Sequence, residues 1–209
     1  MEQSRKKIAR ALISVYHKDG LEAIISNLHE CGVEILSTGG TQAWIQAQGI
    51  PVKAVEDLTG YPSILGGRVK TLHPKVFGGI LGRRSNDSDC KEMEEYDVPG
   101  IDLVIVDLYP FRETVEAGGS EQEIIEKIDI GGPTMLRAAA KNFNDVTVIV
   151  DPADYEQVLS DIRETGNTTL KTRFRLAVKV FQLTSTYDTT IARWLEKVDV
   201  DSNAYFQGE

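Results

Sequence analysis

The predicted fold rests on the stretch Val33-Glu34-Ile35-Leu36-Ser37-Thr38-Gly39-Gly40-Thr41. Its apolar start predicts a short buried strand over 33–36, and its polar, glycine-containing end leads into a helix over 42–48. The preceding segment has the same order, with a crowded apolar run over 8–15, a polar turn, and a helix that Gly32 ends. Repeated units of strand, polar turn and helix favour a parallel sheet, in which ligands bind at the carboxyl ends of the strands.

The rest of the chain continues this alternation and predicts an α/β fold. We expect strands over 52–55, 101–106 and 146–150, and helices over 120–128, 153–162 and 169–197. Asp19 is the expected cap of the first helix, and Ser120 with Glu123 has the spacing of a capping box. Residues 56–75 show no periodicity and are long for a structureless loop in a compact domain, which favours a functional role.

Composition limits the classes of partner. The 209 residues include 23 Lys plus Arg against 32 Asp plus Glu, which gives a net charge of -9. Nucleic-acid binding usually needs a broad basic face, so we expect none. No run approaches the roughly 20 apolar residues of a membrane-spanning helix, and we expect no membrane partner.

The start of the chain and its sparse thiols and imidazoles give two further expectations. Residues 1–7 are polar and lack the apolar stretch of a secretory signal, so we expect a cytoplasmic location. Cys31 and Cys90 are the only cysteines and have no paired-ligand spacing, and the chain has three histidines. We therefore expect no metal site.

The loop Gly66-Gly67-Arg68-Val69-Lys70-Thr71-Leu72-His73-Pro74 is the strongest candidate for a binding segment. Its glycines let main-chain N–H groups turn towards a ligand, and Arg68, Lys70 and Thr71 add cations and a hydroxyl. Taken singly, each of these cations is more simply a solvated surface residue. Gathered on an acidic chain, they indicate a site for a small anion.

Three other polar turns follow predicted strands or precede helices. The turn over 38–41 is a second candidate anion cradle, although a Gly-Gly pair often means only a tight turn. Asp107 and Tyr109 follow the strand over 101–106, where Tyr109 alone is more simply a packed aromatic. Asp129 precedes a small-residue helix that ends near Lys141, and Lys141 alone could be a cation that favours a helix C-terminus.

Together, residues 66–74, 107–111, 129–132 and 137–142 resemble the IMP cyclohydrolase domain of the bifunctional purine biosynthesis protein, in the same order. The resemblance runs from about residue 8 to residue 198. It implies a methylglyoxal-synthase-like fold, which is a three-layer sandwich with a mainly parallel sheet. It also implies ring closure of 5-formamidoimidazole-4-carboxamide ribotide to inosine monophosphate (IMP) with loss of water, and it requires no cofactor or metal.

The resemblance also assigns roles to residues. Lys141 resembles the proton-transferring lysine of the family and Asp129 its carboxylate partner, while Lys70 and Tyr109 resemble the remaining catalytic groups. The positions that match nucleotide-binding segments are Ser14, Tyr16, His17, Lys18, Thr38, Gly39, Gly40, Thr41, Arg68, Val69, Thr71, Val106, Asp107 and Ile130.

Two departures from the family pattern concern the site. The family often has Ser-Val-Ser-Asp-Lys where this chain has Ser14-Val15-Tyr16-His17-Lys18, so a phenol replaces a small hydroxyl at position 16. Asp107 stands where many members carry asparagine. This leaves open whether residue 107 contacts the base by its side chain or by its backbone.

Two other functions remain alternatives. One is a regulatory module of the same fold that binds a phosphorylated effector without chemistry. The presence together of four catalytic-type residues argues against it; they are Lys70, Tyr109, Asp129 and Lys141. The other is a methylglyoxal synthase, whose triose substrate needs fewer contacts than the loop over 56–75 offers.

Oligomer state and chain organisation complete the expectations. Leu176, Val180, Leu183, Tyr187 and Ile191 form an apolar stripe on the last helix that is either core or dimer surface, and the resemblance implies a homodimer. We expect one cyclohydrolase-like domain over 1–200 and a linker or vector-derived tail over 201–209. In the family, a folate-dependent formyltransferase domain follows this one, and it is absent from these 209 residues.

Overall fold

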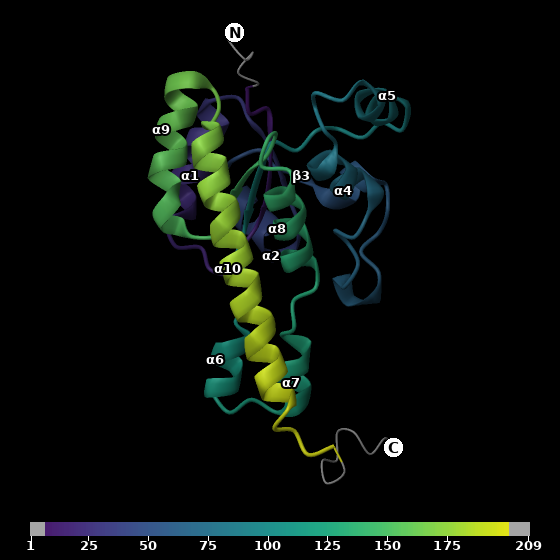
Figure 1. Ribbon diagram of the computed structural model, residues 1–209, viewed down its shortest axis with the longest axis vertical. Coiled ribbons are helices and arrows are strands. Elements are labelled where there is room, and N and C mark those ends of the chain that lie inside the picture. The colour runs from purple at the N-terminus through teal and green to yellow at the C-terminus, as the bar shows by residue number, and fades with distance from the viewer. Residues whose placement is uncertain (1–6, 201–209) are drawn as a thin grey trace.

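The structure is a computed structural model in which residues 7–200 are described. Its centre is a five-stranded, all-parallel sheet in the order β3-β2-β1-β4-β5, and helices surround this sheet in Figure 1. The strands are β1 (Arg10–Ser14), β2 (Glu34–Ser37), β3 (Lys53–Ala54), β4 (Leu103–Val106) and β5 (Thr147–Ile149). The expected α/β fold with a parallel sheet is confirmed, and the tail over 201–209 lies outside the described residues.

Helices connect the strands and cover the sheet. They are α1 (Leu21–Glu30), α2 (Gly39–Ala47), α3 (Val55–Thr59), α4 (Pro74–Leu81), α5 (Asp87–Glu95), α6 (Phe111–Glu116), α7 (Glu121–Glu126), α8 (Gly131–Lys141), α9 (Tyr155–Thr165) and α10 (Leu170–Leu195), with 3₁₀ helices η1 (Leu65–Gly67) and η2 (Pro152–Asp154). Helices α1 and α2 contact the β1–β2 side of the sheet, whereas α8 contacts β4 and β5. None of the helices among residues 7–200 is long and apolar enough to cross a membrane.

The order of the strands determines where a ligand can bind. From β1 the chain moves outward through β2 to β3, and it then returns to β1's other side and moves outward through β4 to β5. The direction therefore reverses between the neighbouring strands β1 and β4, which pair in parallel with Ser14 opposite Val106. At such a switch point the connecting helices diverge to opposite faces and leave a crevice beyond the carboxyl ends of the two strands.

Apolar sequence explains the central strands. All four residues of β4 are buried, as are the middle three of β1, because a parallel sheet is covered by helices on both faces. The capping box of Ser120 and Glu123 forms at α7 as predicted. The cap predicted at Asp19 is wrong, because α1 has Gly20 in a left-handed conformation as its N-cap.

Two predicted segments differ from the structure in ways that affect the site. Helix α2 begins at Gly39, three residues before the predicted start, so both glycines of the turn lie in its first turn. The segment over 56–75 is not one structureless loop, because it contains part of α3, the 3₁₀ helix η1 and the start of α4. The first error arises because glycine has low helix propensity, which tertiary contacts override here. The second arises because α3 and η1 are too short to show a periodicity in the sequence.

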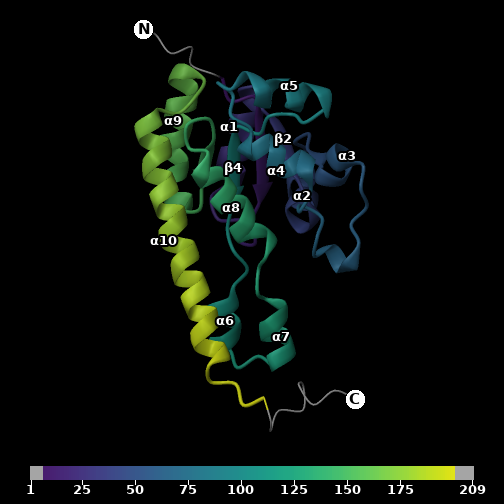
Figure 2. The same cartoon turned by 45° about the vertical axis from the view of Figure 1, so that its right-hand side comes forward.

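Helix α10 runs along the whole molecule, and its C-terminal half extends beyond the sheet to lie beside α6 and α7 (Figures 1 and 2). Leu176 and Val180 of the predicted stripe are fully buried in the core, and Leu183 packs against it. That part of the stripe is therefore core. The exposed apolar residues of α10 include Phe174, Val178 and Phe181 instead.

Candidate functional site

A cavity of about 1150 Å³ lies at the carboxyl ends of β1 and β4. Most of the residues predicted from the sequence line it, although they come from five separate segments. They are Ser14, Tyr16, Lys18, Thr38, Gly40, Thr41, Arg68, Lys70, Thr71, Val106, Asp107, Tyr109, Asp129 and Ile130. His17, Gly39, Val69 and Lys141 are not among the lining residues.

One end of the cavity is the N-terminus of α2, whose first N–H groups have no partner within the helix. Thr38 is the N-cap residue in an extended conformation, but its side chain makes no capping bond. Its Oγ1 is buried and has no hydrogen-bond partner among the described residues, and the residue is 4% exposed. A buried hydroxyl without a partner is costly, so this atom indicates a place where a ligand oxygen completes the site.

Glycine at position 39 lets a cation approach this helix end. Gly39 has φ +55°, and a Cβ built on it would lie 2.9 Å from Lys70 Nζ. Any other residue would therefore be strained and would push the ammonium group away. Lys70 places its charge beside the N-terminus of α2, and the two together favour an anion.

Thr41 and Lys18 hold the loop that follows β1. Thr41 Oγ1 donates to the Val15 carbonyl at 2.8 Å and accepts from the Val15 N–H at 3.1 Å. Lys18 Nζ donates to the Tyr16 carbonyl at 3.0 Å and also to the Val15 carbonyl. Burial lowers the pKa of Lys18, and the nearby Asp107 carboxylate opposes this shift.

Asp107, the residue after β4, is bonded to the same loop after β1. Its carboxylate accepts from the backbone N–H of Tyr16 and, at 2.9 Å, from that of His17. The His17 ring nitrogen Nδ1 also lies 2.9 Å from Asp107 Oδ2. Both carboxylate oxygens are thus engaged by the β1 loop, which favours a structural role for the side chain of residue 107.

The other end of the cavity is the N-terminus of α8, where Asp129 lies. Asp129 Oδ1 accepts from the Gly132 N–H at 2.8 Å. A Cβ built on Gly132 would lie 2.4 Å from Asp129 Oδ2, and one on Gly131 would lie 2.9 Å from Thr71 Oγ1. The glycine pair is therefore required for the carboxylate and the 66–71 loop to approach α8 so closely.

Burial sets the acid–base properties of this end. It raises the pKa of Asp129, while hydrogen bonds from backbone N–H groups partly oppose the shift. It also raises the pKa of Tyr109, with a smaller contribution from the negative charge of Asp129. The pair can hold protons at a higher pH than the same groups in water, which suits proton exchange with a bound substrate.

Tyr187 of α10 fixes the segment that carries Asp129. Its hydroxyl accepts from the Asp129 N–H at 2.9 Å and donates to the Lys127 carbonyl at 3.0 Å. Burial raises the pKa of Tyr187 to about 12. The residue that the sequence assigned to an apolar stripe therefore connects α10 to the site.

Sequence reasoning missed several residues that line the cavity. They include Trp44, Glu126, Lys127, Ile128 and Met135. Glu126 forms an ion pair with Arg68, so the cavity edge carries both signs of charge. The sequence offered one indication that Lys127 lines the cavity, which is its position two residues before Asp129. It was overlooked because Lys127 belongs to no glycine-rich turn.

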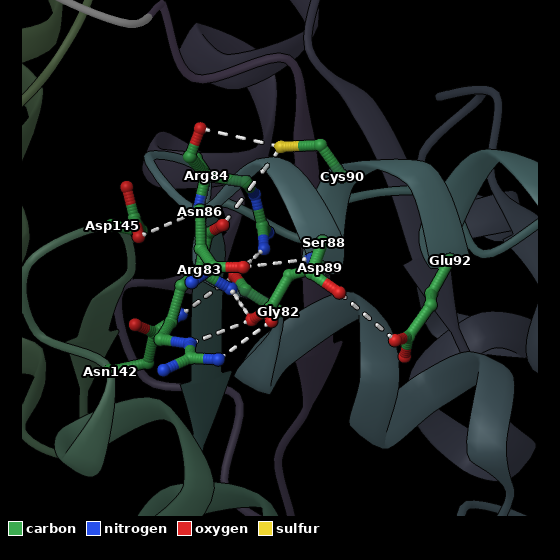
Figure 3. A network of polar contacts seen from close by, with 10 residues as sticks. All are labelled: Gly82, Arg83, Arg84, Asn86, Ser88, Asp89, Cys90, Glu92, Asn142 and Asp145. Carbon is green, nitrogen blue, oxygen red and sulfur yellow. Dashed lines mark hydrogen bonds and ion pairs between the residues drawn. The ribbon is translucent and has the colours of Figure 1, made fainter.

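Lys141 lies at the opposite end of α8, roughly 15 Å from Gly131 at 1.5 Å per residue. Its side chain is exposed. The neighbouring Asn142 is buried, and its Nδ2 donates to the carbonyls of Ile80 at 2.8 Å and Gly82 at 3.2 Å. Figure 3 shows the bond from Asn142 to Gly82 as part of a larger polar network, in which the Arg84 N–H also donates to Asp145. This end of the helix joins α8 to the chain after α4.

Among residues 7–200, no three His, Cys, Asp or Glu side chains are grouped so that they could hold a metal ion. The cavity offers cations, hydroxyls, backbone N–H groups and the carboxylates of Asp107, Glu126 and Asp129, of which Asp129 is partly buried. These groups can bind an anion at one end and exchange protons at the other.

Comparison with protein families agrees with this geometry. Residues 20–134 match the family model described as the MGS-like domain. The chain belongs to this family. Residues 139–208 match a second model, described as the AICARFT/IMPCHase bienzyme. The matched MGS-like segment contains the turns at 38–41, 66–71, 107–109 and 129–132 that form the cavity.

Relatives of the MGS-like chain carry the name that the sequence motifs suggested. This chain is 56% identical to the bifunctional purine biosynthesis protein PurH of Bacteroides thetaiotaomicron over 192 residues, which cover 91% of the chain and 38% of the relative. The PurH of Ruminiclostridium cellulolyticum is 54% identical over 197 residues, which cover 93% and 38%. The chain thus spans under two fifths of the length of these relatives. A solved structure described as the crystal structure of ForH is 39% identical, with a TM-score of 0.78 over 88% of this chain and 97% of that one. The resemblance inferred from the sequence is confirmed.

Proposed function

We propose that this chain is an IMP cyclohydrolase domain that closes 5-formamidoimidazole-4-carboxamide ribotide to IMP with loss of water. The observation that carries the proposal is one cavity with the unpartnered Thr38 hydroxyl at one helix N-terminus and the partly buried Asp129 carboxylate at another. A nucleotide has matching ends, because its phosphate is anionic and its base carries the groups that exchange protons. The relatives named for purine biosynthesis support this reading.

The phosphate occupies the α2 end in this proposal. Backbone N–H groups of the first turn and Thr38 Oγ1 donate to its oxygens, and Lys70 and Lys18 supply positive charge. The loop over 66–71 connects the two ends, because Lys70 lies against Gly39 and Thr71 lies against Gly131. Fixing the phosphate and the ribose in this way holds the two reacting groups of the base together, and such alignment can contribute about 7 to 11 kcal/mol.

The chemistry at the α8 end is an intramolecular condensation. The carboxamide nitrogen attacks the formyl carbon, so a C–N bond forms and negative charge develops on the formyl oxygen. That oxygen leaves as water with one proton from the carboxamide nitrogen and one from the formamide nitrogen, and a C=N bond forms to the latter. The site must therefore accept two protons and deliver both to the same oxygen.

Asp129 and Tyr109 are the groups that we assign to this proton transfer, because both line the cavity and burial raises the pKa of each. General acid–base help of this kind typically contributes about 10²- to 10⁴-fold. A catalytic role for Lys70, which the resemblance also implies, stays a prediction, because its ammonium group lies beside Gly39 at the α2 end. A catalytic role for Lys141 stays a prediction of the resemblance, since its position at the far end of α8 does not support contact with the base.

One assay tests the proposed function. The purified chain is mixed with the formamido ribotide, and formation of IMP is followed by its hypoxanthine absorbance. We expect catalysed product formation that Asp129→Asn removes and that the formamido riboside, which lacks the phosphate, does not support at the same concentration. A wild-type chain that binds IMP but never accelerates ring closure would identify a binding module instead.

Further properties of the whole protein are proposals of the same kind. We propose a cytoplasmic homodimer, and in longer relatives a formyltransferase domain joined to this one. The exposed α10 residues Phe174, Val178 and Phe181 recur at helical spacing and offer one apolar face to a second copy. Light scattering at micromolar concentration tests this, and a monomer mass at every concentration would contradict it.

A further inference from the structure

Lys127 is a cation in the cavity that no sequence motif singled out. It lies two residues before Asp129 in the segment between α7 and α8, and it lines the cavity. Its Nζ lies 5.5 Å from the centre of the Tyr16 ring and 5.9 Å from the centre of the Tyr109 ring. The two rings themselves pack edge to face with their centres 6.0 Å apart.

The aromatic rings hold this ammonium group in place of a carboxylate. Within the part of the chain that the structure describes, no ion pair joins Lys127 Nζ to an acidic side chain, although Glu126 and Asp129 are close in sequence. A ring face attracts a cation without neutralising it. The charge of Lys127 is therefore positioned and remains available to a ligand anion.

The backbone beside Tyr16 connects this charge to the phosphate end of the cavity. Tyr16 follows Val15, whose backbone is bonded to Thr41 in the first turn of α2. The Tyr16 carbonyl accepts from Lys18 Nζ at 3.0 Å. Tyr16 thus follows a residue that is bonded to the first turn of α2, and its ring lies against Lys127.

We propose that Lys127 is a further binding residue for the 5′-phosphate of the nucleotide, held in position by the ring of Tyr16. The inference rests on the proposed function. It also accounts for the departure at position 16. The small hydroxyl that the family often has there can donate one hydrogen bond directly to a phosphate oxygen. In this chain the phenol ring supports a cation, and the cation makes the contact.

Binding of two ligands by titration calorimetry tests the proposal. IMP and inosine differ only by the phosphate, so a residue that contacts the phosphate affects IMP alone. We expect Lys127→Gln to weaken IMP binding by about tenfold, as for loss of a hydrogen bond to a charged group, and to leave inosine binding unchanged. Lys127→Arg should keep most of the affinity, because arginine also stacks on aromatic rings and binds phosphate.

Two further variants complete the design. Tyr16→Leu removes the ring but no charge, and we expect it to weaken IMP binding less in the Lys127→Gln background than in the wild type. Lys171→Gln removes an exposed charge on α10 outside the cavity and should leave both ligands unaffected. The Lys127 variants should fold, because Tyr187 bonds to the backbone carbonyl of residue 127 and to no side-chain atom there.

The results separate this inference from the proposed function. Unchanged IMP affinity in Lys127→Gln, or an equal loss for IMP and inosine, would overturn the phosphate contact. A fall in kcat at unchanged IMP affinity would overturn it too and would place Lys127 at the Tyr109 end. Failure of the wild type to bind IMP or to close the ring would instead remove the proposed function on which the inference rests.

Discussion

The two ends of helix α8 differ in burial, in hydrogen bonding and in their position relative to the cavity. At its N-terminus, Asp129 is partly buried beside two glycines, accepts a backbone N–H at 2.8 Å and faces the cavity. At its C-terminus, Lys141 is exposed, and Asn142 uses its side chain to hold the carbonyls of Ile80 and Gly82. Both ends belong to motifs that resemble the family, but only the first end lies at the cavity. A shared motif therefore does not show which of its residues touches a ligand.

Removing the charge of Asp129 is expected to have the largest effect. Asp129→Asn keeps the size and can still accept from the Gly132 N–H, but it cannot take a proton, so kcat should fall by about 10²- to 10⁴-fold. Steady-state kinetics with the formamido ribotide measure this. Lys141→Leu is the matched variant at the other end of the helix, and it should keep most of its kcat. The opposite result, with Lys141→Leu inactive and correctly folded, would show that both ends of α8 take part in the reaction.

Two threonines in the α2 turn should behave differently, and the expected effect is about tenfold. Thr38→Val removes a buried hydroxyl that has no partner, so KM should rise by about tenfold with no loss of stability. Thr41→Val removes the bonds to Val15 and should also lower the free energy of unfolding. Kinetics and denaturant titration of both variants check this. Equal stability losses would show that both hydroxyls are structural.

The C-terminal end of α8 should matter for stability and not for catalysis. Asn142→Ala leaves the buried carbonyls of Ile80 and Gly82 without their donor, so the free energy of unfolding should fall by about 1 to 3 kcal/mol. Denaturant titration gives the stability and the ribotide assay gives kcat, which should change little. A large fall in kcat at wild-type stability would mean that this end takes part in the reaction.

The smallest expected effect is a pH dependence of stability at the N-terminal end. Burial raises the folded-state pKa of Asp129 above its ordinary 3.8, so its stabilising contribution is complete below that pH and is lost as pH rises through the folded-state pKa. Asp129→Asn lacks this loss and should gain stability relative to wild type as pH rises above 3.8. Denaturant midpoints at several pH values measure the difference. A difference that does not change with pH would show that the carboxyl titrates normally.

The sequence predicted the elements well where a local pattern was strong. The apolar run of β4 and the capping box at α7 form as expected. The start of α2 was predicted three residues late, because Gly39 and Gly40 are poor helix formers in isolation. In the fold they lie in the first turn, where Lys70 approaches Gly39 too closely for any side chain.

The role of individual site residues was less predictable. Lys127 was missed because its importance comes from two rings on distant segments, at Tyr16 and Tyr109. Tyr187 was assigned to an apolar stripe, since helical spacing records which face a residue is on and not what its hydroxyl bonds to. The stripe itself proved to be core at Leu176 and Val180.

By itself the sequence determined the alternation of strand and helix, the glycine-rich turns and the family to which they belong. These depend on local periodicity and on the backbone freedom of glycine, which neighbouring residues largely fix. The tertiary structure was needed to show that the turns at 38–41, 66–71, 107–109 and 129–132 meet at one cavity and that Lys141 is not among the residues that line it. The turns meet because the reversal of strand order between β1 and β4 brings the carboxyl ends of distant strands together. Lys141 lies about 15 Å from Gly131 because it is ten residues further along α8.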